Sequence, residues 1–319
     1  MYQGPYQMKD MPDTYETPLK GLDWHDWLTK MAQITDDDGY TERLGDRHAA
    51  ILVEEKPVLL VTFENYQSIS LNNDMGHPLG WEMVKALGWS HLCLVSNGET
   101  WFRDDRVYRY FDRLVDDGFL EDFDQVIFYG AGACGYAAAA FSVAAPGAKV
   151  LVLQPQATLD PRLTEWDQRY RHMRRTSFTD RYGYAPDMLD AAQQAFVVYD
   201  PEITEDAMHA ALFRRPNVTL FPMRHVGRGM EQSLLRMNVL LRMIAQLSAD
   251  KLTPRRIARL FRARREDGTY QFNLLKRLST ENRSYLVMLL AGKVLEKRES
   301  PPFRKAFSRA KAKLGIRAV

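Results

Sequence analysis

The sequence contains short runs in which apolar residues occupy consecutive positions, and these runs restrict the folds open to the chain. The clearest are VLLVTF at 58–63 and KVLVLQ at 149–154. A strand with one exposed face alternates apolar and polar residues, whereas a strand covered on both faces does not. These runs therefore predict strands of a mostly parallel sheet that helices cover above and below.

Seven strands are predicted in all, at 50–53, 58–63, 91–95, 125–129, 150–153, 196–199 and 218–221. The segments between them, among them GWEMVKAL, DRVYRYFDRLVDDGF and EDAMHAALF, carry apolar residues at helical spacing. Alternating strands and helices are typical of the α/β class. The sequence therefore predicts a doubly wound α/β sheet.

Composition excludes several classes of protein. With 319 residues, of which 45% are hydrophobic, the chain can bury a core without disulfides or structural metal. Its two cysteines, Cys93 and Cys134, exclude a disulfide scaffold and a four-cysteine zinc site. The histidines are scattered and no G-x-x-x-x-G-K phosphate loop is present, so no metal or cofactor is expected. No secretory signal or run of about 18 apolar residues is found, and the expected compartment is the cytosol.

Charge is distributed unevenly along the chain. Residues 251–319 hold 19 Lys and Arg against 5 Asp and Glu, whereas residues 1–250 hold 24 against 36. We therefore expect three parts: an N-terminal helical or irregular segment at 1–48, an α/β domain at 49–247 with a helical insertion at about 155–194, and a basic helical appendage at 248–319.

The basic appendage is expected to dock first on the acidic body of the chain, and otherwise on an external polyanion or an acidic membrane surface. A nucleic-acid partner is disfavoured, because Ile257, Leu260 and Phe261 recur at helical spacing and are typical of packing against the body. The sequence identifies no other partner and predicts no oligomeric state.

The most informative segment is QVIFYGAGACGYAAAAFSVAA at 125–145, where an apolar strand runs through a glycine-rich turn into a helix of small residues. Small residues allow a sharp turn and a close approach of helix and strand, and the first N–H groups of the helix point above the turn. The segment resembles the elbow of the α/β-hydrolase superfamily, G-x-nucleophile-x-G. In that alignment Gly130 takes the place of the first glycine, Gly132 that of the nucleophile and Cys134 that of the second glycine.

The resemblance continues downstream and covers most of 50–247. In the family an acid follows the seventh strand and a histidine follows the eighth, in that order along the chain. Here Asp200 follows AFVVY, and His225 follows NVTLFPMR. The resemblance therefore implies an α/β-hydrolase fold in which Asp200 orients the imidazole of His225.

The chain departs from the family at Gly132, which has no side chain to attack a carbonyl. One interpretation is a catalytically altered relative that serves as a binding or assembly module. A second makes Cys134 the nucleophile of a hydrolase or acyl transferase, with His225 as its base and the thiol pKa lowered by the start of the helix.

A third interpretation replaces the nucleophile by water. His225 and Asp200 would activate a water molecule in the space that a serine would occupy. The N–H of Ala133 and a donor from the turn that contains Asn65 would then stabilise an oxyanion. This route needs no residue that the chain lacks.

Two polar segments are further candidates for ligand contact. Asn97 lies in the loop VSNGETWFRDD, after a strand expected near the centre of the sheet, where ligands bind in such folds. A turn at 97–98 followed by a helix capped near Asp104 explains the same residues. The second segment, RYRHMRRTSF at 169–178, could clamp a phosphate or carboxylate, or could form a solvated helix face.

Gly130, Gly132 and Gly135 also match the dinucleotide-binding spacing G-x-G-x-x-G. The next strand ends at Gln154, where a ribose-binding acid would be expected, and this disfavours a nucleotide site. The chain also looks like bacterial proteins named phosphoadenosine phosphosulfate reductase, in YGAGACGYAAAAFSVAAPGA and in LDPRLTEWDQRYRHMRRTSFTDRYGYAPDML. Reductases of that name carry an S-G-G-type pyrophosphate loop and a cysteine near the C-terminus, and this chain has neither. A nucleotide-dependent reductase is therefore the minor alternative.

Overall fold

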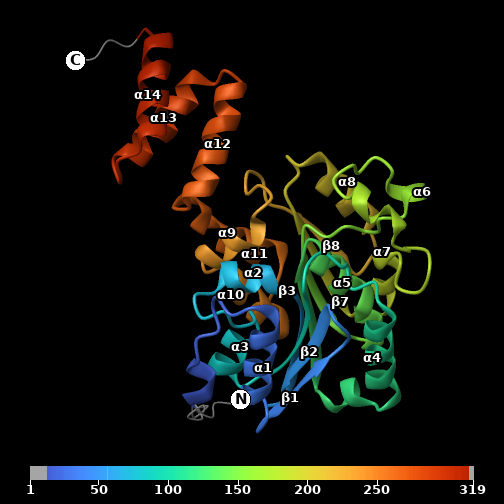
Figure 1. Cartoon of the computed structure of the whole chain (residues 1–319). Helices are drawn as coiled ribbons and strands as arrows, with labels where there is room; N and C mark the ends of the chain where they lie inside the picture. Colours follow the sequence, from blue (N-terminus) through green and yellow to red (C-terminus); the bar gives the residue numbers. More distant parts are fainter. Residues whose placement is uncertain (1–12, 56, 316–319) are drawn as a thin grey trace.

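A computed structural model describes residues 13–55 and 57–315 of the chain (Figure 1). Its eight strands are β1 (Gly39–Arg43), β2 (His48–Val53), β3 (Val58–Asn65), β4 (Ser90–Ser96), β5 (Gln125–Ala131), β6 (Lys149–Leu153), β7 (Gln194–Tyr199) and β8 (Val218–Pro222). They form one sheet in the order β1-β2-β4-β3-β5-β6-β7-β8. β2 runs antiparallel to both of its neighbours, and the other pairs are parallel.

The predicted α/β class and its mostly parallel sheet are confirmed, and all seven predicted strands are present. The sequence missed β1, whose residues GYTER contain no apolar run. β1 pairs with β2 alone and lies at the edge of the sheet, where its residues stay partly exposed. An edge strand needs no continuous apolar run, because only part of it is covered.

Helices cover both faces of the sheet (Figure 1). Those in the body of the chain are α1 (Trp24–Ile34), α2 (Tyr66–Asn72), α3 (Trp81–Leu87), α4 (Asp105–Asp116), α5 (Ala133–Phe141), α8 (Thr204–Leu212), α9 (Met230–Arg236) and α10 (Leu240–Ser248). α4 and α5 share one buried cluster with Leu59, Val61 and Phe63 of β3, while Leu60 of the same strand packs with α10 on the opposite face. This two-sided burial explains the unbroken apolar run of β3.

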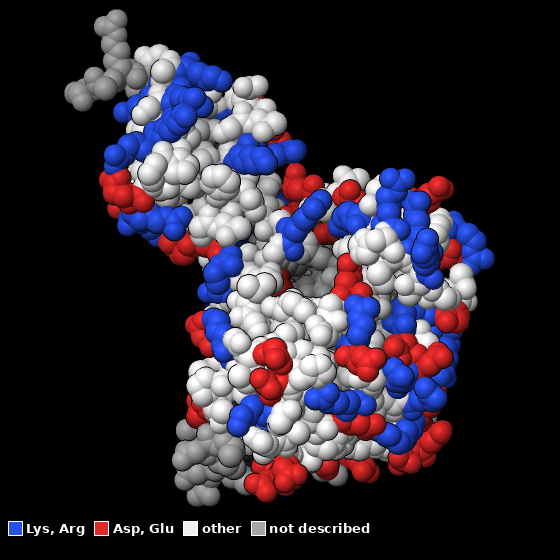
Figure 2. All heavy atoms as spheres, in the orientation of Figure 1, with Lys and Arg blue, Asp and Glu red and all other residues white. Residues whose placement is uncertain are grey.

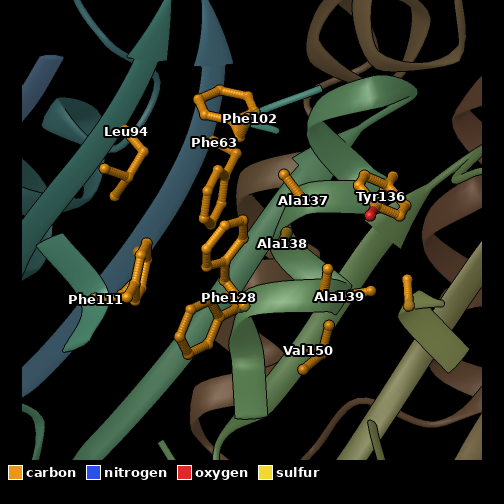
Figure 3. Close-up of a cluster of buried hydrophobic side chains, with 14 of the residues drawn as sticks. Phe63, Leu94, Phe102, Phe111, Phe128, Tyr136, Ala137, Ala138, Ala139 and Val150 are labelled. Atoms are coloured by element: carbon orange, nitrogen blue, oxygen red, sulfur yellow. The ribbon is translucent and has the colours of Figure 1, made fainter. Parts of the chain in front are cut away.

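The core between the sheet and α5 combines large aromatic residues with alanines (Figure 3). Phe63 stacks on Phe111 of α4 with ring centroids 5.9 Å apart. The alanines at 137–139 of α5 are fully buried. Small side chains on this helix let its axis approach the strands closely, which the elbow at its N-terminus requires.

The predicted helical insertion after β6 is built from short helices and turns. It consists of short pieces, α6 (Pro161–Thr164), η4 (Arg171–Arg175), α7 (Ala185–Met188) and η5 (Leu189–Ala191), joined by turns. α7 packs beside α5, and the Tyr136 hydroxyl donates a hydrogen bond to the Tyr182 carbonyl at 2.7 Å. The insertion is therefore fastened over the helix that begins at the elbow.

Arg103 and Trp101 hold this insertion in place. The Arg103 guanidinium donates to the carbonyls of Ser177 and Arg181, each at 3.0 Å, and forms an ion pair with Asp180. The Trp101 ring is 1% exposed and contacts Tyr136, Tyr170 and Phe178 edge-on. The loop that follows β4 thus serves the packing of the insertion.

The sequence predicts a single helix at 230–247, and the chain after β8 departs from this prediction. It forms α9 and α10, which are separated at Asn238, a residue with φ of 53°. α11 (Pro254–Leu260) then packs on the body, because Ile257 and Phe261 belong to the same buried cluster as α10 and the sheet. Docking of the appendage on the body is therefore found at its first helix.

The last three helices are α12 (Gly268–Thr280), α13 (Ser284–Leu295) and α14 (Pro301–Lys313), and they project away from the sheet (Figure 1). They have a core of their own, formed by Leu275, Val287, Ala291, Val294, Phe303 and Ala310. The division at 1–48, 49–247 and 248–319 stays a prediction, and residues 1–12 and 316–319 lie outside the described residues. No helix in the described part of the chain is long and apolar enough to cross a membrane.

One of the tight backbone contacts of the fold lies between Gly130 of β5 and α5. A Cβ atom at Gly130 would lie 2.2 Å from the Cys134 carbonyl oxygen, whereas one at Gly147 would meet nothing within 4 Å. We expect Gly130→Ala to lower the free energy of unfolding by about 3 kcal/mol, because neither backbone segment can move aside.

The matched control is Gly147→Ala, which has room for the methyl group but a φ of 84°. Its cost should be about 1 kcal/mol, from backbone strain alone. Urea unfolding of both variants measures the difference. Equal losses would show that the crossing of α5 over β5 is not the tight contact described here.

Candidate functional site

The turn between β5 and α5, at which the sequence predicts an elbow, has a strained backbone at Gly132. Gly132 adopts φ 58° and ψ −125°, a conformation that strains residues other than glycine. Its N–H donates to the Leu153 carbonyl at 2.8 Å, and its carbonyl accepts from the Tyr136 N–H at 2.9 Å. A Cβ atom at this position would point into open space. The apex of the turn therefore has room for a side chain, which Gly132 lacks.

The Cys134 thiol lies two residues beyond the apex and lines a pocket. Burial raises its pKa well above the ordinary value, and the carboxyl groups of Glu231 and Glu64 add to the rise. The expectation that the helix start lowers this pKa is wrong, because desolvation and two nearby carboxyl groups outweigh the helix dipole. The thiol is held in its un-ionised, weakly nucleophilic form.

The pocket, which we call the elbow pocket, has a volume of about 560 Å³ and opens at the carboxyl ends of β3 and β5. The chain leaves β3 toward β4 on one side and later returns to β5 on the other, so the pocket lies where the strand order reverses. Ligands of open α/β sheets bind at this kind of position. Its polar lining includes Glu64, Asn65, Ser68, Asn72 and Glu231, and its apolar lining includes Ile69, Leu79, Leu235 and Leu241.

Glu64 is the next-to-last residue of β3 and reaches into the elbow pocket. Its carboxyl group accepts hydrogen bonds from the Leu79 N–H at 3.0 Å and from the Thr62 hydroxyl at 2.7 Å. Burial raises its pKa to about 7, against the lowering effect of these hydrogen bonds, and the charge of Glu231 contributes to the rise. Near neutral pH the group is therefore divided between its acid and its carboxylate form.

Glu231 enters the same pocket from the first turn of α9. It accepts hydrogen bonds from the Tyr129 hydroxyl at 2.6 Å and from the Asn72 side chain at 2.9 Å. Burial raises its pKa too. Two carboxyl groups from distant parts of the sequence thus share one pocket beside the elbow.

Asp200 and His225 lie after β7 and β8, in the predicted chain order, but they make different contacts from those predicted. The Asp200 carboxylate accepts from the backbone N–H of Gly227 at 2.8 Å and from that of Glu202 at 3.0 Å. The His225 ring lies against Tyr270 of α12, with centroids 6.1 Å apart. Among the described residues no hydrogen bond or ion pair joins Asp200 to the imidazole. Asp200 therefore shapes the backbone of the loop and does not orient the ring.

A close histidine–aspartate pair occurs elsewhere, at the insertion. His209 Nε2 lies 3.0 Å from the Asp167 carboxylate, and His209 Nδ1 accepts from the Ala157 N–H at 3.1 Å. Arg169 bridges Asp167 to Asp206. Burial would raise the pKa of Asp167, but the hydrogen bonds from His209 and Arg169 lower it. Both nitrogens of His209 are occupied, so this buried network is structural.

The remaining predicted site residues divide between two roles. Asn65 caps α2, accepting from the N–H groups of Gln67 and Ser68, and also lines the elbow pocket. Asn97 accepts from the Gln67 side chain at 2.8 Å and serves to fix its loop. Ala133 opens α5, and no acceptor for its N–H is found within the described residues. Its N–H is thus available to a ligand above the turn.

The strand order, the antiparallel second strand and the strained elbow occur together. This is the α/β-hydrolase fold. No protein-family model matches the sequence, and the search of curated proteins gives no match.

Solved structures of esterases and of an alpha/beta hydrolase domain-containing protein are similar to the chain at low sequence identity. Est1E from Butyrivibrio proteoclasticus is 14% identical over 66% of this chain and 100% of that one, with a TM-score of 0.41. The hyperthermophilic esterase from the archaeon Pyrobaculum calidifontis is 15% identical over 72% and 91%, with a TM-score of 0.44. Alpha/beta hydrolase domain-containing protein 10 from mouse is 14% identical over 67% and 99%, with a TM-score of 0.40. The strand order and the antiparallel β2 define the fold.

Glu64, His91 and Cys93 could each offer a metal ion one ligand atom, since these atoms lie within 4.8 Å of one another. In this α/β-hydrolase fold they are already joined by hydrogen bonds. Cys93 donates to Glu64, and the Thr62 hydroxyl lies 2.8 Å from His91 Nε2. Metal-bound histidines usually donate their second ring N–H to a partner, whereas His91 Nδ1 has none among the described residues. The cluster fits a metal poorly and supports the Glu64 carboxyl group.

Sequence reasoning missed Glu64 and Glu231. Glu64 directly follows the apolar run of β3, and a polar residue at the carboxyl end of a central strand is a usable signal. Glu231 lies in the segment 230–247, which the sequence predicts to be a helix, and nothing in its sequence context distinguishes it from a surface residue.

The raised pKa of Glu64 predicts a pH dependence of stability. The pKa of Glu64 is about 7 in the folded chain, whereas its ordinary value is 4.5. The folded chain therefore favours the protonated carboxyl group more than the unfolded chain does. The stability that the protonated Glu64 contributes is complete below its ordinary pKa of 4.5 and is lost as the pH rises through 7. As the pH rises from about 5 to 8, the free energy of unfolding of Glu64→Gln should therefore rise by about 2 kcal/mol relative to that of the parent.

Urea unfolding at several pH values measures this difference. The exposed Glu121, changed to Gln, is the control and should leave the pH dependence of the parent unchanged. A constant difference between Glu64→Gln and the parent across this range would contradict the raised pKa.

Proposed function

We propose that this chain is a catalytically altered α/β-hydrolase-fold protein that binds a small organic molecule non-covalently in the elbow pocket. The observation that carries the proposal is Gly132, which holds the strained elbow backbone without a side chain. A covalent acyl-enzyme needs a nucleophile at that apex. The pocket beside the apex is retained, with Cys134 and Ala131 in its wall.

The alternative of a thiol hydrolase or acyl transferase receives little support. The pKa of Cys134 is raised, so the reactive thiolate is disfavoured near neutral pH. The alternative of water activation retains the open N–H of Ala133, but Asp200 is engaged with the backbone of Gly227 and Glu202. A dyad without its orienting contact would be a weak base for this purpose.

The charge of the pocket indicates what kind of ligand it admits. Its lining contains four acidic residues, Glu64, Asp74, Glu82 and Glu231, and one arginine, Arg236. The acidic residues would repel an anionic ligand, whereas they would not repel a neutral or cationic one. The pyrophosphate of a nucleotide is among the disfavoured groups, which counts against the nucleotide-dependent reductase suggested by the second resemblance.

Activated acyl esters test the loss of covalent catalysis. We expect the parent chain, Cys134→Ser and His225→Ala to hydrolyse 4-nitrophenyl acetate and butyrate at rates within about twofold of one another, with no burst of nitrophenol. Stopped-flow absorbance measures both quantities. A burst that disappears in Cys134→Ser would establish the thiol route. A large loss of steady rate in His225→Ala alone would establish water activation.

A matched set of small aromatic molecules tests the pocket itself. Benzylamine, benzamide and benzoate share one ring and differ in charge. Ligand-observed NMR should rank benzylamine and benzamide above benzoate, because the carboxyl groups in the lining repel an anion. Ser68→Trp, which fills the pocket from α2, should weaken the binding at least about fivefold.

Ser70→Trp is the control, because Ser70 lies on the same helix outside the pocket lining. It should leave the affinities unchanged. Tightest binding of benzoate would contradict the proposed ligand class. Equal effects of the two tryptophan variants would place the binding site outside the elbow pocket.

A further inference from the structure

The projecting helices α12–α14 carry a concentrated positive charge. Residues 268–315 hold 11 Lys and Arg against 3 Asp and Glu. α14 contains five basic residues and no acidic one. Figure 2 shows blue side chains gathered over this part of the molecule, well away from the mixed surface of the body.

The basic residues of α14 include an exposed stripe. Lys305, Arg309 and Lys313 are spaced by four residues and are exposed, so they lie along one face of the helix. Among the described residues no ion pair is found for these three side chains. Their charges are therefore available to an external anion.

The neighbouring helix α13 exposes apolar side chains that its own core leaves uncovered. Val287, Ala291 and Val294 turn inward with α14. On the outward face Tyr285 is 58% exposed, Leu286 45% and Leu289 50%. Phe272 of α12 is also exposed, at 49%. Large apolar side chains gathered on one small helical unit are typical of an interaction surface.

We propose that α13 and α14 form a docking surface for an anionic lipid bilayer, with the apolar side chains of α13 entering the interface and the basic stripe of α14 contacting lipid headgroups. Interfacial helices combine these two features, a basic polar face and an apolar face with leucine and aromatic residues. Neither helix is long and apolar enough to cross the bilayer. The chain would rest on the membrane surface.

A bilayer accounts for this surface better than a nucleic acid does. Phosphate tracking requires basic side chains and polar contacts, but gives no reason for exposed Leu286 and Leu289. The acidic body would be repelled by the same membrane, and the projection of α12 holds α13 and α14 away from the body. The separation of charge along the chain therefore favours one orientation on the lipid surface.

Co-sedimentation of the full chain with vesicles tests the proposal. Vesicles of phosphatidylcholine with about one third phosphatidylglycerol should bind the chain, and binding should fall steeply with salt. Vesicles of phosphatidylcholine alone should bind at least about tenfold more weakly. The double variant Leu286→Ser with Leu289→Ser should lose about tenfold in affinity for the anionic vesicles, since its apolar contacts are removed.

Two controls match these changes. Leu163→Ser removes a leucine that is 53% exposed on the insertion, and it should bind as the parent does. Lys305→Glu with Arg309→Glu should abolish binding, whereas the same reversal at the exposed Arg109 and Arg214 of the body should not weaken it. All changed residues are exposed, and circular dichroism checks that the variants fold.

Three results would overturn the proposal. The first is equal binding to neutral and anionic vesicles, or binding to neither. The second is unchanged binding of the Leu286→Ser, Leu289→Ser variant. The third is binding of duplex DNA at a salt concentration that prevents binding to anionic vesicles. Each result is independent of whether the elbow pocket takes a ligand.

Discussion

The crossing of α5 over β5 is the contact on which the rest of the site depends. At Gly130 the strand and the helix backbone approach so closely that no side chain fits between them. This approach forces the chain through the strained turn at Gly132 and directs the first N–H groups of α5 above the sheet. The wall of the elbow pocket, including Cys134, follows from the same crossing. The turn therefore keeps a strained backbone at Gly132, a residue without a side chain.

Much of the fold could be predicted from the sequence, because buried parallel strands leave continuous apolar runs. The strands at 58–63 and 150–153 were found in this way. β1 could not be found, since an edge strand lacks that pattern. The break between α9 and α10 depends on one left-handed residue, Asn238, which a helical pattern does not reveal. At Asn238 the local backbone conformation overrides a periodic signal, whereas β1 carries no such signal.

The site was less predictable than the fold. Chain order brought Asp200 and His225 to the correct strand ends, but their partners depend on tertiary contacts that the sequence does not contain. The pKa of Cys134 was misjudged for the same reason, because burial and two carboxyl groups come from other elements. Glu231 shows the limit most plainly, since only folding brings α9 beside Tyr129.

The loop that contains His225 is bound from outside by α12. The Asn273 side chain donates to the carbonyls of His225 and Val226, and Arg277 pairs with Glu202 beside Asp200. This loop is therefore the mounting point of the helical arm. Mechanical load on that arm, from whatever surface it meets, would be transmitted first to the loop between β8 and α9.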